Sequence, residues 1–229
     1  MFHFGYISFF FFIAIFLAFF VPGDLALRRL QLSSFQRFVL GTILGMVLWG
    51  WQGFIFGYLG LRWLSYPYLL IAFTFWVKTY IKGNRINPFE KLRSRKINLL
   101  LLALILTGSL IQLTRVWFTG TLYSNGLYFC CGNTSDSLFH IALTNQIVKT
   151  FPPFQPGMFG VIVHNYHYWS NLVIAELIRV FHLPLIATQY QYSTLLISTF
   201  LGLSALVFGQ VIKLGKSFVL WLMIFFKLF

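Results

Sequence analysis

The stretch FGYISFFFFIAIFLAFFV, residues 4–21, decides the broad class of this chain, because it is apolar from end to end. A helix that crosses a bilayer needs about 17–25 such residues in succession. Further apolar runs follow, and the whole chain is 59% hydrophobic and only 9% charged. A soluble domain averages about 25% charged residues. The sequence therefore predicts an all-α fold, a polytopic transmembrane helix bundle with an external juxtamembrane helix.

The apolar runs predict roughly six or seven membrane spans. They cover residues 4–21, 38–59, 66–81, 97–117, 168–181 and 188–212, with a partial run at 217–229. The net charge of +13 does not indicate nucleic-acid binding, because the Lys and Arg residues are concentrated in connections rather than on a basic helix face. Membrane lipids, and no nucleic acid, are the partners that this composition predicts.

The basic connections predict which loops face the cytoplasm. Residues 22–37 carry three Arg, and residues 78–96 carry seven Lys and Arg against one Glu. Because positively charged loops tend to stay in the cytoplasm, the turn at Arg62 and the long loop from residue 118 to about 166 are expected on the extracytoplasmic side. The second basic connection also divides the chain into a three-helix N-terminal part, residues 1–96, and a second membrane part, residues 97–229.

The long loop contains the residues with the most evident chemistry. It reads CGNTSDSLFH at residues 131–140, FPPFQP at 151–156 and HNYHY at 164–168. Asp136 is one of only four acidic residues in the chain. Residues 136–150 predict a short interfacial helix that is too polar to span, and the prolines that follow end it. Asp136 and His140 are four positions apart, so they share one face of that helix.

Four chemical interpretations of this loop stay open from the residues alone. Asp136, His140, His164 and His167 have workable spacings for a metal site, although five His in the whole chain are too few for a di-iron oxygenase. Asp136 would alternatively remove a proton from an acceptor hydroxyl. An acid and a His beside the membrane also suit ion or proton transport. In the structural interpretation, Asp136 caps a helix while His and Tyr side chains anchor the interface.

The order of these elements resembles the C-type membrane glycosyltransferases. It is closest to the bacterial branch similar to the mannosyltransferases and aminoarabinose transferases, which use polyprenyl-phosphate sugars. The resemblance covers roughly residues 97–212, and it is carried by DSLFH at 136–140, FPPFQP at 151–156 and YHY at 166–168. It implies a lipid-linked sugar donor and transfer to an extracytoplasmic acceptor at a bacterial plasma membrane.

The same resemblance implies roles for individual residues. Asp136 corresponds to the catalytic base or acceptor-binding carboxylate of the first external loop. The family's Tyr-His-Tyr element corresponds to Tyr166, His167 and Tyr168, which would bind substrate. A leaving phosphate also needs positive charge, and His140, His167 and Arg115 are the residues available to supply it. The paired acids that bind metal in some relatives are absent, because serines flank Asp136 on both sides. No cofactor is therefore expected, and a divalent metal is not favoured. Family members continue through further helices, which makes the chain an expected N-terminal fragment.

Two other pairs of residues stand out. Glu176 and Arg179 are three positions apart in the expected span at 168–181, with Arg179 near its cytoplasmic end, and we expect them to pair or to face the bundle interior. Cys130 and Cys131 are adjacent, and a disulfide between neighbours would strain the backbone. We therefore predict that these cysteines do not bridge each other.

Overall fold

The computed structural model describes residues 2–81, 99–129 and 134–212, and their regular secondary structure is almost entirely helical. The first helical rod consists of α1 (Phe2–Ile15), the π-helical segment η1 (Phe16–Phe20) and α2 (Val21–Ala26). The next elements are α3 (Ser34–Tyr58), the short 3-10 turn η2 (Arg62–Leu64), α4 (Ser65–Ile81) and α5 (Leu99–Val116). A two-stranded hairpin, β1 (Thr121–Tyr123) and β2 (Gly126–Tyr128), precedes α6 (Thr134–Lys149) and α7 (Trp169–Phe181). The last described elements are α8 (Leu185–Ala187), the π-helical segment η4 (Thr188–Tyr192) and α9 (Ser193–Val211).

Three of the described helical segments are long and apolar enough to cross a membrane. They are Gly5–Ala26, Ser34–Tyr58 and Leu185–Val211, and the apolar helix Leu100–Val116 is somewhat shorter. The all-α class is confirmed, and the chain is a membrane protein. The expected run at 217–229, the basic connection beyond residue 81, the division at residues 96–97 and the two cysteines lie outside the described residues.

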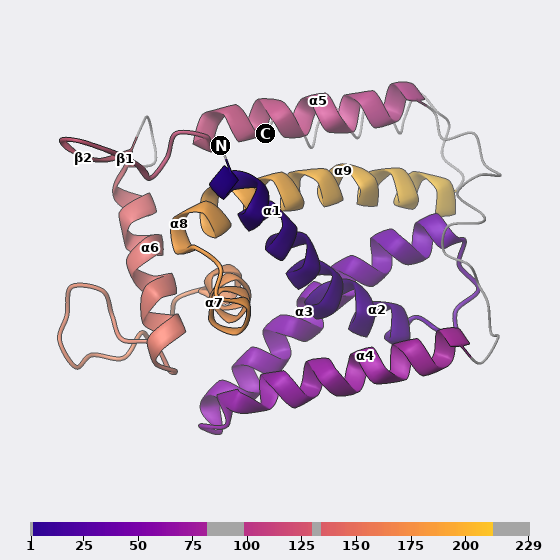
Figure 1. Ribbon diagram of the computed structural model, residues 1–229, viewed down its shortest axis with the longest axis horizontal. Helices are drawn as coiled ribbons and strands as arrows, with labels where there is room; N and C mark the ends of the chain where they lie inside the picture. Colours follow the sequence, from indigo (N-terminus) through magenta and orange to yellow (C-terminus); the bar gives the residue numbers. More distant parts are fainter. Residues whose placement is uncertain (1, 82–98, 130–133, 213–229) are drawn as a thin grey trace.

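Helices α3, α4, α5 and α9 run between two ends of the bundle (Figure 1). At one end α2, α4 and α9 finish while α3 and α5 begin; we call it the basic end, because Arg28, Arg29 and Lys78 lie there. At the other end α3 turns into α4, and α5 leads through the hairpin to α6; we call it the Asp136 end. The end of α2, the start of α3 and the end of α4 therefore lie at the same end of the bundle.

Glycine allows the first rod and α3 to cross in backbone contact. A Cβ atom on Gly23 would lie 1.8 Å from the Gly41 carbonyl oxygen, and one on Gly45 would lie 1.6 Å from the Phe19 oxygen. No larger residue fits at these positions. Small residues of this kind let helices approach closely in a membrane, where packing rather than water drives their association.

Polar contacts tie α2, α3 and α4 together at the basic end. Ser33 and Gln36 form a capping box at the start of α3, which satisfies two of its free backbone N–H groups. Arg37 forms an ion pair with Asp24 at 3.8 Å, and the Trp76 indole Nε1 donates to the same carboxylate at 3.0 Å. Asp24 is thus engaged by α3 and α4 at once.

Helix α7 differs from the sequence expectation. Residues 168–181 were expected to span, but α7 has 13 residues, is seen along its axis in Figure 1, and lies crosswise to α5 and α9. Such a helix extends only about 20 Å, against about 30 Å for the hydrocarbon core. Its residues from Asn171 to Ile178 are all buried, because it packs against α3 and α6 inside the protein. The following helix begins at the Asp136 end, so α9 runs from there to the basic end.

Candidate functional site

Helix α6 carries Asp136 in its first turn and crosses the Asp136 end of the bundle. The short polar helix that the sequence predicted is therefore present. The Asp136 side chain is exposed, and the described contacts include no hydrogen bond or ion pair to its carboxylate. An acid in the first turn also interacts favourably with the helix dipole, which is what the structural interpretation requires of Asp136.

The inner face of α6 is fixed on α7 by apolar contact. Leu143 and Ile147 are fully buried, and they pack against Leu172 and Ala175 of α7. These α6 residues are four apart, as a helical face requires. Asp136, seven positions before Leu143, shares that face at the start of α6, yet its side chain is exposed. The result is a rigid platform with an exposed acid at one end.

His140 is held by a buried amide of α7. The Asn171 amide nitrogen donates to the Thr144 hydroxyl at 2.8 Å and to the His140 carbonyl oxygen at 3.3 Å. Its amide oxygen, which can only accept, lies 3.2 Å from His140 Nδ1. This network assigns the hydrogen of a neutral His140 to Nδ1, and it leaves Nε2 as the basic nitrogen.

The YHY segment joins an aromatic cluster at the same end. The Tyr166 ring lies 5.2 Å from Phe139 and 6.3 Å from His140, and it stacks on His167 at 4.8 Å, measured between ring centroids. Tyr166 is therefore a neighbour of the predicted site, while the exposed side chain of His167 lies on its outer side.

Tyr168 faces a different neighbour from Tyr166. Its hydroxyl oxygen lies 3.5 Å from that of Tyr58, and its ring contacts Phe151 of the proline-rich segment. Burial raises the pKa of the Tyr168 phenol, and the hydrogen bond with Tyr58 adds to the rise. Tyr168 thus connects the loop to α3 and stays neutral at ordinary pH. It is a packing residue here rather than a neighbour of Asp136.

The end of α5 and the start of α6 are anchored by adjacent residues of η4. Gln191 donates from Nε2 to the Trp117 and Thr119 carbonyl oxygens at 3.0 and 2.9 Å, beyond the end of α5. Tyr190 donates its hydroxyl to the Ser137 carbonyl oxygen at 2.7 Å. Arg115 is exposed in the last turn of α5, so η4 secures both the segment that carries Arg115 and the one that carries Asp136.

A buried ionic cluster adjoins this platform. Glu176 has an exposed fraction of 0%, and it forms ion pairs with Arg179 of its own helix and with Arg62 of the α3–α4 turn. Arg62 also donates from Nη1 to the Val148 carbonyl oxygen of α6 at 3.2 Å, and Ser65 donates to Glu176 at 3.4 Å. The expected pairing of Glu176 with Arg179 is confirmed.

The sequence did not predict the part of Arg62. It lies 114 positions from Glu176, and the only signal was a cation in an otherwise apolar turn. Arg179 was expected near the cytoplasmic end of a span, yet it lies beside Arg62, at the same end of the bundle as Asp136. The reason is that α7 does not cross the bundle.

The interpretation of the loop as a metal site finds no geometric support in the described part of the chain. Within it, no group of three or more His, Cys, Asp or Glu side chains lies close enough together to hold a metal ion. Asp136, His140, His164 and His167 are therefore not gathered around one point. Comparison of the chain with protein-family models, curated proteins and solved structures found no match.

Proposed function

We propose that this protein is a multi-pass membrane glycosyltransferase that transfers a sugar from a polyprenyl-phosphate donor to an extracytoplasmic acceptor in a bacterial plasma membrane. The observation that supports this proposal is a difference between its acidic residues in their ion pairing. Asp24 and Glu176 are both engaged by arginines, whereas the carboxylate of Asp136 is exposed. Of the three acids that lie in the described residues, Asp136 alone is available for chemistry on a substrate.

The position of Asp136 supports this proposal. Its helix lies across one end of apolar helices that are long enough to span, so a substrate anchored in lipid would present its head group at that level. The sequence supports an extracytoplasmic Asp136 end, because residues 22–37 and 78–96 together carry ten Lys and Arg. The described helices that border these residues, α2, α3 and α4, meet them at the opposite end of the bundle.

In the proposed reaction, Asp136 accepts the proton of an acceptor hydroxyl. The acceptor oxygen forms a bond to the anomeric carbon of the sugar while the bond from that carbon to the phosphate oxygen breaks. Polyprenyl phosphate leaves with the electron pair of that bond. General-base assistance of this kind contributes about 10²–10⁴-fold to the rate.

The departing phosphate needs positive charge or hydrogen-bond donors. Arg115 supplies a permanent positive charge at the end of α5, and the exposed His167 supplies a hydrogen-bond donor from the YHY segment. His140 is oriented by Asn171, so its protonated form would donate from Nε2 to the phosphate. Tyr166, stacked on His167, would position that ring.

The test is turnover by membranes that contain the protein, measured as release of polyprenyl phosphate from a panel of polyprenyl-phosphate sugars. Asp136→Asn is expected to lower turnover by at least about two orders of magnitude, because the amide cannot accept the proton. His140→Ala is expected to cost less, without rescue by added divalent metal. Lys149→Gln is the matched control, since Lys149 is an exposed charge at the other end of α6.

Two outcomes would contradict the proposal. Near-normal turnover in Asp136→Asn would leave Asp136 as a residue that only stabilises the start of α6. Absence of turnover with every donor, from folded protein that moves ions or protons across liposomes, would favour the transporter alternative instead.

A further inference from the structure

A cavity lies between the first rod, α3 and α4, and it extends along α4 from the α3–α4 turn to the basic end. Its volume is about 700 Å³. It exists because α3 and α4 are joined by a tight turn at the Asp136 end, while α2 fills the space between them only toward the basic end (Figure 1). Leu48 and Phe56 of α3 form one wall, and Pro22 and Leu25 form the wall next to the basic end.

The longest wall is a face of α4 that is almost free of polar groups. It runs from Pro67 through Ile71, Ala72 and Phe75 to Thr79. The twelve helical rises from Pro67 to Thr79 extend about 18 Å, which is close to one leaflet, half of the roughly 30 Å hydrocarbon core. The cavity therefore matches a hydrocarbon chain in depth and in chemistry.

A cation stands at one end of this apolar wall. Arg28 lines the cavity two residues after Ala26, where the first candidate span ends, so its guanidinium lies at the level of the head groups. Its Nη1 donates to the Thr79 hydroxyl at 3.1 Å, which holds the side chain over the cavity mouth. Exposed Lys78 adds a second positive charge one residue before Thr79, the partner of Arg28.

No acid of the described chain neutralises Arg28. The ion pairs found there use Asp24 for Arg37, and Glu176 for Arg62 and Arg179. Asp24, the nearest acid in sequence, is further engaged by the Trp76 indole. Arg28 therefore keeps an uncompensated charge beside an apolar cavity.

We propose that this cavity binds an anionic phospholipid, with an acyl chain along α4 and the head-group phosphate on Arg28. An interfacial arginine and an anionic head group attract each other by about 1 kcal/mol, which corresponds to about fivefold in affinity. The inference is independent of the proposed transfer reaction, because Arg28, the proposed head-group ligand, lies at the basic end and Asp136 at the other.

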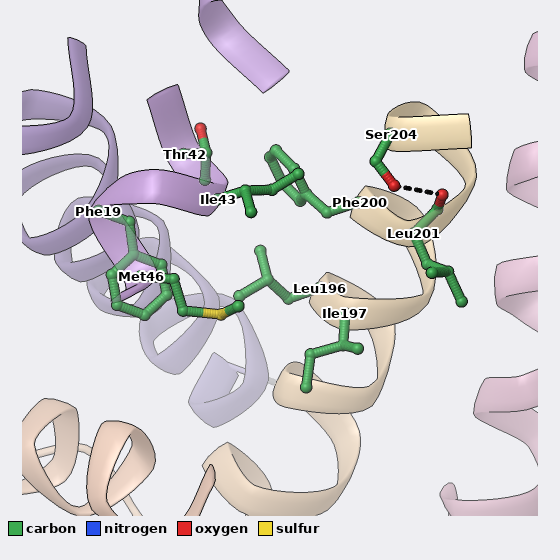
Figure 2. A pocket seen from close by; sticks show the side chains of 9 residues that line it. All are labelled: Phe19, Thr42, Ile43, Met46, Leu196, Ile197, Phe200, Leu201 and Ser204. Carbon is green, nitrogen blue, oxygen red and sulfur yellow. Dashed lines mark hydrogen bonds between the residues drawn. The ribbon is translucent and has the colours of Figure 1, made fainter. Parts of the chain in front are cut away.

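A second, smaller crevice provides the internal comparison. It holds about 190 Å³ between α3 and α9, and Figure 2 shows Met46, Leu196 and Phe200 pointing into it. Its hydroxyl groups are satisfied within their own helices, since Thr42 donates to the Phe38 carbonyl and Ser204 to the Leu201 carbonyl. Without a charged residue in its lining, this crevice has no means of selecting a head group.

The test is native mass spectrometry of the full chain in mild detergent, titrated with phosphatidylglycerol or with phosphatidylcholine of the same acyl chains. Arg28→Gln is expected to weaken phosphatidylglycerol binding about fivefold and to leave phosphatidylcholine binding unchanged. Arg29→Gln is the matched control, because it removes the same charge one residue away from a side chain that lines the cavity. It is expected to change binding less than about twofold.

A second variant fills the cavity. Ala72→Trp is expected to displace the bound lipid, because Ala72 lies in the α4 wall with only 8% of its surface exposed. If that protein does not fold, Ala72→Leu is expected to weaken the same binding to a smaller degree. Glycerol 3-phosphate, which lacks the chains, is expected not to compete.

Three results would overturn the proposal. The first is an equal loss in Arg28→Gln and Arg29→Gln, which would indicate a diffuse field rather than a site. The second is unchanged lipid binding in a folded Ala72 variant. The third is competition by glycerol 3-phosphate, which would show that phosphate alone is recognised.

Discussion

The buried cluster of Glu176, Arg62 and Arg179 predicts an unequal response to substitution. Glu176 is fully buried, and it accepts from Arg62 Nε at 3.2 Å and from Arg179 Nε at 3.2 Å. Glu176→Gln removes the only negative charge and leaves two guanidinium groups side by side. Breaking a buried ion pair by removing one partner costs about 3–5 kcal/mol of unfolding free energy. We expect a loss in that range.

Arg62→Gln is expected to cost less, about 1.5–3 kcal/mol, because Glu176 keeps Arg179 and the cluster becomes neutral. This residue is nevertheless the only one of the two arginines that reaches Glu176 from another helix, since Arg179 is on α7 itself. The double variant should therefore be more stable than the sum of the single losses predicts. Contacting charged residues show coupling energies of about 0.5–3 kcal/mol.

The assay is reversible unfolding by SDS in mixed micelles, followed by tryptophan fluorescence, for the two single variants and the double variant. The expected order is a larger loss of unfolding free energy for Glu176→Gln than for Arg62→Gln. Equal losses for Glu176→Gln and Arg62→Gln, or a coupling energy below about 0.5 kcal/mol, would refute it. In that case apolar packing, rather than the charges, would hold α7 against the α3–α4 turn.

Two further predictions use the same unfolding assay. Gly53→Ala is expected to destabilise by about 1–3 kcal/mol, because its Cβ would lie 2.6 Å from Glu176 Cγ; the control Gly5→Ala meets no atom within 4 Å and should be neutral or slightly stabilising. Asn171→Ala is expected to cost about 1–3 kcal/mol, because it leaves buried polar groups of α6 without partners. An Asn171→Ala protein as stable as the parent would show that water replaces the amide, and the orientation assigned to His140 would then fail.

Apolar runs were enough to predict the helical class, the long spans and the short polar helix after α5. They were not enough for α7. A largely apolar run is buried either in lipid or in protein, and composition alone does not distinguish the two. Length was the available signal, because a run of 10–14 residues is typical of a buried core helix rather than of a span. The charged pair Glu176 and Arg179 within it pointed the same way.

The residues that hold the site together could not be read from the sequence, because their partners are far apart in the chain. Asn171 meets His140 across 31 positions, and Arg62 meets Glu176 across 114. Neither pairing follows from periodicity. Asp136 and His140 were found because helical spacing is local, whereas their support depends on how α7 turns across the bundle.

Asp136 and Glu176, the two acidic residues of the second part of the chain, have opposite environments. The position of Asp136 depends on the contacts of Glu176. Glu176 fixes α7 to the α3–α4 turn through Arg62. Five residues earlier on the same helix, Asn171 holds α6 at His140, one helical turn from Asp136. A chain of contacts therefore leads from a buried charge, which has no access to solvent, to an exposed one that has no partner of its own among the described residues. This arrangement suits a site on a membrane surface, because the exposed acid can stay solvated while buried contacts elsewhere hold its helix in position.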